Sequence, residues 1–179
     1  ELDSKFNSED YIEINFDEID DKIYQYQQLS KFFEVEPSNL FSIKDKILNA
    51  VADYNNQYFN FDISAGVSQI DLLKYESGGK YDWHQDVVWH SESSHRKVTM
   101  IIQLSDSEDY QGGGLQFKRK DVDMSEFRRR GSAFLFPSCL VHRIEPLTSG
   151  QRQSIVAWVN GSAVLNKEKS ESEILKCKF

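Results

Sequence analysis

Cysteine is scarce in this chain, which holds only Cys139 and Cys177 among its 179 residues. So few cysteines cannot form the framework of several disulfides that stabilises many small secreted domains. Cys139 lies in an apolar stretch, where a cysteine is more often a small buried hydrophobic residue than a reactive thiol. Since neither cysteine belongs to a Cys-x-x-Cys pair, we expect a reducing, cytoplasmic setting.

Long apolar runs and a surplus of positive charge are also absent. No segment approaches the roughly 20 apolar residues of a transmembrane helix, and no signal peptide is visible, so we expect no membrane partner. Asp and Glu number 29 against 21 for Lys and Arg, a formal net charge of −8. Because such a chain repels phosphate backbones, we expect no nucleic-acid partner. A basic cluster at residues 118–130 is either a solvated hairpin end or a local contact for an anion or substrate.

Aromatic residues, by contrast, make up 13% of the chain and suit the half-buried faces of a β-rich domain. Helical spacing is clearest between residues 42 and 54, where an amphipathic helix is predicted, with Ser42 and Asp45 resembling a capping box at its start. A shorter helix is predicted near residues 16–26. The apolar face of the longer helix consists of Ile43, Ile47, Ala50, Val51 and Tyr54.

From residue 67 onward the apolar pattern alternates with a period of two, which is typical of strands. A loop is predicted at residues 106–114 and a turn at 146–150. Together these signals predict one domain over residues 1–179 of mainly β (α+β) class, with a helical support region at 1–66, a β core at 67–162 and a charged tail at 163–179. The predicted strands lie at 70–72, 98–104, 115–117, 133–136, 140–144 and 154–159.

A His-x-Asp pair, His84 and Asp86, carries the first sign of chemistry. Residues i and i+2 of a strand project to the same face, so the two side chains can aim at one metal ion. His142, in a strand-like run, is the best candidate for a third ligand. Two histidines and one carboxylate form the facial triad of non-haem Fe(II) oxygenases, which leaves positions open for a bidentate 2-oxo acid and O₂.

Taken alone, a His-x-Asp pair occurs by chance and then means a surface histidine beside a solvated aspartate. Arg152 strengthens the metal hypothesis. If the strands on either side of the 146–150 turn pair with each other, its guanidinium returns to the metal pocket. There its planar fork would suit the far carboxylate of a keto-diacid.

The order of motifs between residues 67 and 160 resembles the prolyl-4-hydroxylase-like branch of the 2-oxoglutarate/Fe(II)-dependent dioxygenases. The resemblance implies a double-stranded β-helix (jelly-roll) core with N-terminal helices that support one sheet. It is carried, in chain order, by residues 75–81 (YESGGKY), 84–86 (HQD), 96–99 (RKVT), 112–117 (GGGLQF), 131–137 (GSAFLFP), His142, 150–152 (GQR) and Trp158.

The resemblance also implies roles for single residues. His84, Asp86 and His142 would bind iron, and Arg152 would pair with the C5 carboxylate of 2-oxoglutarate. The implied cofactors are Fe(II), 2-oxoglutarate and O₂, with ascorbate as an additional candidate. Gln103 stands where some relatives place a tyrosine as a second contact to that carboxylate. The co-substrate positions are Tyr75, Thr99 and Gln103, and the positions at the substrate mouth are Arg96, Trp158 and Tyr81.

The implied reaction is hydroxylation of a C–H bond, of a peptidyl proline in a peptide or protein partner, with release of succinate and CO₂. The alternative is hydroxylation of a free amino acid or another small molecule. A carboxylate at Asp86 favours hydroxylation, because related halogenases have a small residue there. The acidic charge disfavours a nucleic-acid dealkylase, and Arg152 disfavours a cupin that uses a metal without 2-oxoglutarate.

Three neighbouring features have simpler interpretations. His90 and His95 are expected in a polar loop rather than as ligands. Residues 87–95 form a candidate lid, because binding loops sit on rigid scaffolds. Trp83 is expected in the core, whereas Trp158 and Tyr75 suit the core and the cavity equally.

Overall fold

The structure, a computed structural model, describes residues 37–87, 91–118 and 126–162. The predicted helix near 16–26 and the charged tail lie outside the described residues, as does His90. The elements are α1 (Pro37–Tyr54), η3 (Asn55–Phe59), β1 (Gly66–Glu76), β2 (Tyr81–His84), η4 (Glu92–His95), β3 (Arg96–Gln103), β4 (Tyr110–Gly112), β5 (Leu115–Phe117), η5 (Glu126–Arg128), β6 (Ala133–Pro137), β7 (His142–Ile144) and β8 (Leu147–Asn160).

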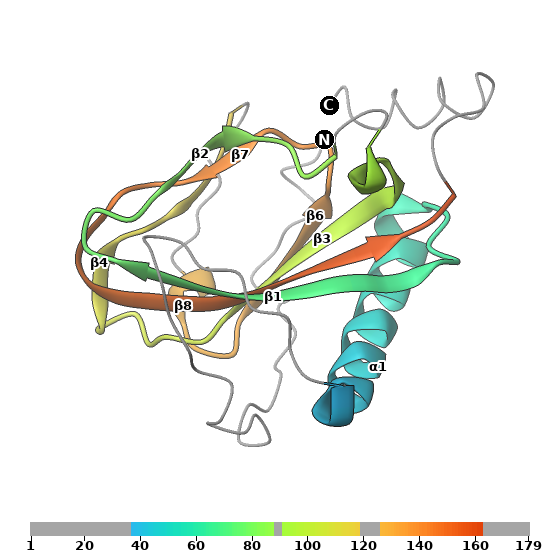
Figure 1. Ribbon diagram of the computed structural model, residues 1–179, viewed down its shortest axis with the longest axis horizontal. Helices are drawn as coiled ribbons and strands as arrows, with labels where there is room; N and C mark the ends of the chain where they lie inside the picture. Colours follow the sequence, from blue (N-terminus) through green and yellow to red (C-terminus); the bar gives the residue numbers. More distant parts are fainter. Residues whose placement is uncertain (1–36, 88–90, 119–125, 163–179) are drawn as a thin grey trace.

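Two antiparallel sheets face each other (Figure 1). The larger sheet has the strand order β1-β8-β3-β6, with β4 paired to one end of β8. The smaller sheet has the order β2-β7-β5. Because the chain passes repeatedly from one sheet to the other, residues far apart in sequence meet in the space between them.

Helix α1 covers the outer face of the larger sheet (Figure 1), where it contacts β1, β3 and β8. Ile47 and Val51 of its apolar face are fully buried against Val98 and Met100 of β3. Burying each such side chain contributes about 1.5–3 kcal/mol. Since strand residues alternate, the neighbours of these β3 residues, among them Thr99, point to the opposite face, between the sheets.

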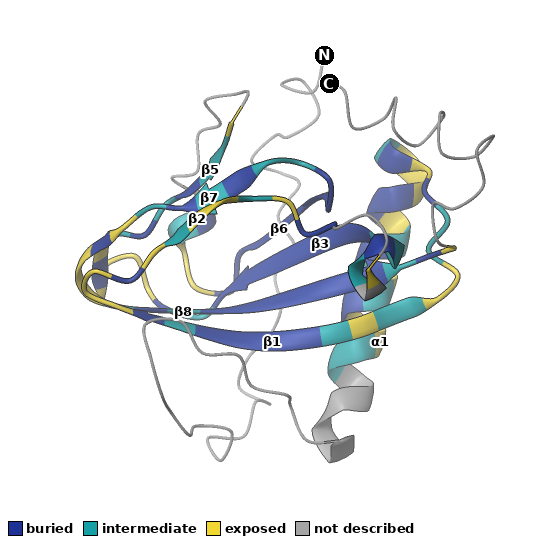
Figure 2. Cartoon of the chain, turned by 45° about the horizontal axis from the view of Figure 1, so that its top comes forward, coloured by how far each residue is buried: buried dark blue, intermediate teal, exposed yellow. Residues whose placement is uncertain are grey.

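Aromatic side chains fill much of the space between the sheets, which accounts for their abundance in the sequence. Strands β3 and β6 of the larger sheet are buried along nearly their whole length, whereas the edge strand β1 is buried mainly in its middle (Figure 2). The buried aromatic residues of this inter-sheet cluster include Tyr75, Tyr110, Phe127, Phe134, Phe136 and Trp158. They form an apolar wall around the polar site described below.

Several predicted boundaries are wrong. Helix α1 begins at Pro37, a residue that suits the first helical turn, so Ser42 lies inside the helix and not at its start. The predicted loop at 106–114 contains the short strand β4. The predicted turn at 146–150 is largely the start of β8, a strand of 14 residues. Strands β7 and β8 do not pair in the described structure, since β7 pairs with β2 and β5.

Three side chains also differ from expectation. Trp83 is 40% exposed, not in the core, and the guanidinium of Arg143 lies 4.6 Å from its ring centre. Cys139 is buried as expected but is disulfide-bonded, which removes the cysteine-based argument for a reducing setting. Arg128 of the basic cluster is not simply solvated, because it donates hydrogen bonds to the carbonyls of Tyr110 and Gly112.

Among the described helices, none has the length and apolar character needed to cross a membrane.

Candidate metal centre and cavity

Two histidines and an aspartate meet between the sheets. His84 ends β2 and His142 begins β7, and the two are direct partners across this antiparallel pair. Asp86 follows β2, where its backbone N–H donates to the carbonyl of Ser138 at 2.9 Å. One ligand atom from each side chain lies within 4.8 Å of the other two. This separation suits three ligands around one metal ion.

Backbone carbonyls orient both imidazole rings. Nδ1 of His84 lies 2.7 Å from the carbonyl of Asp82, and Nδ1 of His142 lies 2.8 Å from that of Leu140. A carbonyl oxygen only accepts hydrogen bonds, so Nδ1 carries the proton and Nε2 keeps its lone pair. Both Nε2 atoms face Asp86, at 3.5 Å and 3.8 Å from its oxygens.

The electrostatics favour metal-binding protonation states. Burial alone would raise the pKa of Asp86. The contact with His84, the electrostatic influence of the neighbouring His142 and the hydroxyl of Thr99 outweigh burial, so the pKa of this carboxyl lies below its ordinary value. Burial lowers the pKa of His142 against the opposing charge of Asp86. An ionised carboxylate and a neutral imidazole are the forms that bind a divalent cation.

Thr99 has a different immediate contact from the predicted one. Its hydroxyl donates to an oxygen of Asp86 at 2.6 Å and lies 2.9 Å from the hydroxyl of Ser138. Thr99 thereby holds the carboxylate in place, and its contact with a co-substrate stays a prediction.

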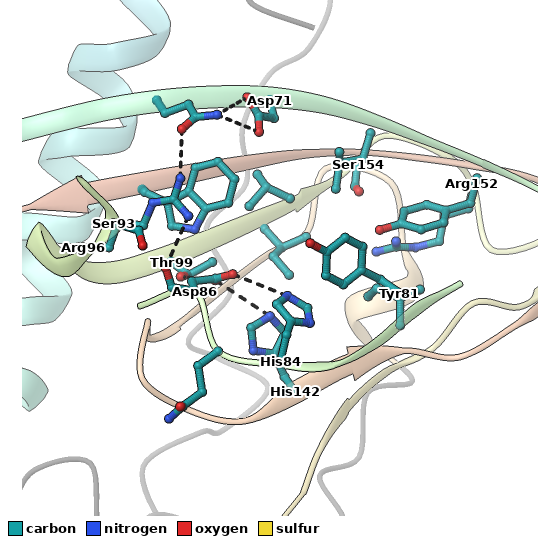
Figure 3. A pocket seen from close by; sticks show the side chains of 18 residues that line it. Asp71, Tyr81, His84, Asp86, Ser93, Arg96, Thr99, His142, Arg152 and Ser154 are labelled. Atoms are coloured by element: carbon teal, nitrogen blue, oxygen red, sulfur yellow. Dashed lines mark hydrogen bonds and ion pairs between the residues drawn. The ribbon is translucent and has the colours of Figure 1, made fainter. Parts of the chain in front are cut away.

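The three side chains open onto a cavity of about 410 Å³ (Figure 3). Alternate residues of neighbouring strands line its floor, as the period of a strand requires. Strand β1 contributes Gln69, Asp71, Leu73 and Tyr75, strand β8 contributes Arg152, Ser154, Val156 and Trp158, and β3 contributes Thr99 and Ile101.

Arg152 closes one end of the cavity. It is 1% exposed, and its strand partner across β1 and β8 is Tyr75. Burial lowers the pKa of Arg152, against the opposing effect of Tyr75 and Tyr110. Burial raises the pKa of Tyr75 to about 12. One guanidinium nitrogen of Arg152, Nη2, is buried and has no hydrogen-bond partner in the described part of the chain. A buried cationic donor without an acceptor is costly, which points to an anionic ligand.

Two residues at this end, Tyr110 and Ser154, were not predicted from the sequence. Gln103 is fully buried, and its Nε2 donates to the phenol oxygen of Tyr110 at 2.8 Å. Tyr110 was missed because it lies in the predicted loop. Ser154 is the strand partner of Gln103, and its buried hydroxyl also has no partner among the described residues. The spacing of two from Arg152 within one strand could have identified Ser154.

Gly150 lets β4 bring Tyr110 to this position. Its φ of +78° lies in the left-handed region, and Tyr110 is its strand partner. A Cβ at Gly150 would collide with the carbonyl oxygen of Asp109. Only glycine therefore allows the close approach of these two backbones. The guanidinium of Arg128 packs against Tyr110, 4.4 Å from the centre of its ring.

The three residues predicted at the substrate mouth do line this cavity. The guanidinium of Arg96 stacks 3.8 Å from the Trp158 ring centre and donates to the carbonyl of Asp86 at 3.3 Å. The ring of Tyr81 lies 4.1 Å from that of His84. The three candidate metal ligands, Arg152, Tyr75 and the residues Arg96, Trp158 and Tyr81 thus line one cavity.

Comparison with known proteins agrees with this geometry. Residues 70–160 match the family model described as the 2OG-Fe(II) oxygenase superfamily. A PKHD-type hydroxylase of Synechococcus sp. (strain CC9605) is 31% identical over 101 residues, which are 56% of this chain and 45% of that protein. A PKHD-type hydroxylase of Sphingopyxis alaskensis is 25% identical over 145 residues, which are 79% of this chain and 66% of that protein. The chain spans about half the length of the Synechococcus relatives that it matches.

Solved structures share the fold at low sequence identity. A viral collagen prolyl hydroxylase from Paramecium bursaria Chlorella virus-1, in its 2OG complex, has a TM-score of 0.55 at 16% identity, over 74% of this chain and 79% of that one. A prolyl-4-hydroxylase of Pseudomonas putida has a TM-score of 0.56 at 18% identity, over 75% and 73%. The predicted fold class, a mainly β double-stranded β-helix, is confirmed.

Proposed function

This chain belongs to the 2OG-Fe(II) oxygenase superfamily, and from that premise we propose that it hydroxylates a C–H bond of a peptidyl proline, with release of succinate and CO₂. Oxygenases of this superfamily use Fe(II), 2-oxoglutarate and O₂. Ascorbate as a further cofactor stays a prediction.

The donor set fits ferrous iron. His84, Asp86 and His142 offer two imidazole nitrogens and one carboxylate, the facial triad of non-haem Fe(II) sites. The Nε2 atom of each histidine is free to coordinate, since each Nδ1 is directed at a carbonyl oxygen. We assign the iron to these three residues.

One observation carries the rest of the proposal: the cavity that holds this triad also holds a fully buried guanidinium with an unpaired nitrogen. We assign the distal carboxylate of 2-oxoglutarate to Arg152, where a bidentate ion pair would satisfy the orphaned donor. The phenol of Tyr75 and the hydroxyl of Ser154 lie beside it in the same wall and can donate further hydrogen bonds.

The residues of the chain have distinct tasks in this proposal. When bound, iron, 2-oxoglutarate and O₂ together supply the oxidising chemistry that places an oxygen atom on a C–H bond. Thr99 keeps the carboxylate of Asp86 oriented. Aromatic side chains exclude water from the co-substrate end, which strengthens the ion pair of Arg152. Arg96, Trp158 and Tyr81 face the substrate.

The proline substrate is supported by the solved structures that share this fold. Prolyl hydroxylases are among them, and one from Trichoplax adhaerens is in complex with a peptide fragment of an oxygen degradation domain (TM-score 0.54, 17% identity, 80% of this chain and 65% of that one). At such identities only the fold is shared. The peptide partner is therefore our proposal for this chain.

The test is a hydroxylation screen. Purified protein is incubated with Fe(II), 2-oxoglutarate and air, together with a panel of proline-containing peptides, free proline and other free amino acids. We expect the mass of a peptide to rise by one oxygen atom, with one succinate formed for each hydroxylation. Hydroxylation of a free amino acid alone would favour the small-molecule alternative. Failure to bind Fe(II) or to form succinate under every condition would refute the enzyme assignment.

A further inference from the structure

A chain of polar contacts crosses the substrate wall of the cavity, away from Arg152 (Figure 3). Arg96 donates from Nη2 to Oε1 of Gln69 at 2.9 Å. The Nε2 of Gln69 in turn donates to both oxygens of Asp71, each at 3.0 Å. Asp71 is 2% exposed, and it lines the cavity. These contacts link the edge strand β1 to the first residue of β3.

Gln69 has only one way to fit between its neighbours. A guanidinium can only donate hydrogen bonds, and an ionised carboxylate can only accept them. The amide must therefore turn its oxygen toward Arg96 and its nitrogen toward Asp71. Asp71 and Arg96 thus both require the same orientation of the Gln69 amide, and Asp71 reinforces from behind the orientation in which Gln69 accepts from Arg96.

We propose that Asp71 and Gln69 are positioning residues that hold Arg96 as a fixed donor toward the substrate. The proposal rests on the proposed function of the cavity and deepens it. Arg96 is held on three sides: by the Trp158 ring, by Gln69 and by the backbone carbonyl of Asp86. A guanidinium has five N–H donors, so donors remain for a ligand in the cavity that Arg96 lines.

This arrangement selects substrates by chemistry. A rigid cation next to Asp86, one of the metal ligands, suits an oxygen acceptor placed close to the C–H bond that reacts. The carbonyl of a peptide group is such an acceptor, and it is present in every prolyl peptide. A substrate without an oxygen at this place would leave the donors of Arg96 unpaired, at a cost in affinity.

Exchanging the carboxylate and the amide gives a sharp test. Asp71→Asn removes the negative charge behind Gln69 and replaces an acceptor-only partner with an amide that can also donate, so Arg96 alone still requires the orientation of the Gln69 amide. The double variant Gln69→Glu/Asp71→Asn restores a defined order, because the carboxylate at position 69 then pairs directly with the guanidinium and the amide at position 71 can donate to that carboxylate. Gln69→Leu removes the amide that links Arg96 to Asp71. The matched control is Glu76→Gln. It also replaces a carboxylate of β1 with an amide, but this carboxylate is exposed and pairs with Lys74 at 3.2 Å.

The first readout needs no substrate. In the wild type, the stacked indole should shift the guanidinium N–H signals of Arg96 upfield in the NMR spectrum, and its contacts should slow their exchange with water. We expect Asp71→Asn and Gln69→Leu to weaken both effects, because Trp158 and the carbonyl of Asp86 still contact Arg96, and the double variant and Glu76→Gln to keep them in full. An unchanged Arg96 signal in Asp71→Asn and Gln69→Leu, or a double variant that stays like Asp71→Asn, would overturn the proposal.

The second readout is kinetic and uses the prolyl peptide found in the screen. We expect Asp71→Asn to raise KM for the peptide roughly tenfold, the loss of about one charge-assisted hydrogen bond, while KM for 2-oxoglutarate is unchanged. Equal rises in both constants would indicate a general structural defect and would also overturn the proposal. If no peptide reacts, the proposed substrate is wrong, but the NMR measurement still decides the role of Asp71 and Gln69.

Discussion

The two ends of the cavity share the strands β1 and β8, yet their two guanidinium groups, Arg152 and Arg96, are satisfied in opposite ways. At the co-substrate end, Arg152 and Ser154 each keep a buried polar atom without a partner in the described structure. At the substrate wall, Arg96 donates hydrogen bonds to Gln69 and to the carbonyl of Asp86, although the nearby Nε1 of Trp158 is buried without a partner in the described structure. Orphaned groups indicate what must bind, whereas paired groups indicate a geometry set before binding.

The largest expected effect lies between these ends, at the proposed iron site formed by His84, Asp86 and His142. His84→Ala should abolish iron binding and succinate formation, because two remaining ligands hold Fe(II) poorly. The iron content after dialysis and the rate of succinate formation measure this. His95→Ala is the control, since that ring lies outside the metal centre, 3.3 Å from the carbonyl of Gly161. Retention of iron by the His84 variant would show that the metal binds elsewhere.

At the co-substrate end, Arg152→Ala should weaken 2-oxoglutarate binding by about 100-fold or more, since a desolvated charge-assisted pair is lost. Iron binding should persist. Calorimetric titration of the anaerobic Fe(II) protein measures the Kd. Arg152→Lys should lose less affinity, because the charge remains but the bidentate fork does not. A wild-type Kd for the Ala variant would place the co-substrate away from Arg152.

A smaller effect is expected from Gln103, whose hydrogen-bond partner Tyr110 is one of the groups that act on Arg152. Gln103→Leu removes the hydrogen bond to the Tyr110 phenol and should raise the Kd for 2-oxoglutarate about three- to tenfold. The KM for the substrate should not change, because Gln103 is remote from the Arg96 wall. A change in the substrate KM alone would mean that the two ends are not independent.

The smallest effect concerns pH. An ordinary tyrosine ionises near pH 10, but burial raises the pKa of Tyr75 to about 12. The group is therefore protonated, and able to donate, throughout the range from about pH 7 to pH 10. The ratio of the 2-oxoglutarate Kd in Tyr75→Phe to that in the wild type should stay constant across this range. A ratio that falls toward one near pH 10 would show that the phenol ionises at its ordinary pKa.

Local patterns in the sequence were sufficient for part of the site. The His-x-Asp pair correctly identified two side chains that meet, although β2 ends at His84 and Asp86 is placed by its backbone hydrogen bond to Ser138 and not by the period of a strand; helical spacing identified the buried face of α1. They failed for Arg152 in detail, since the predicted hairpin of β7 and β8 does not exist among the described strands. Arg152 reaches the cavity through β1, where it pairs with Tyr75, 77 positions earlier (152 minus 75).

The sequence by itself determined which functional groups are present, namely two imidazoles, a carboxylate and a guanidinium. It also determined the strand and helix periods that orient side chains. Only the tertiary structure decided which groups meet. Tyr110 beside Gln103, and Asp71 behind Gln69 and Arg96, depend on strand register and on the close approach at Gly150. Pairing between distant strands is set by the packing of both sheets together, and no local pattern encodes it.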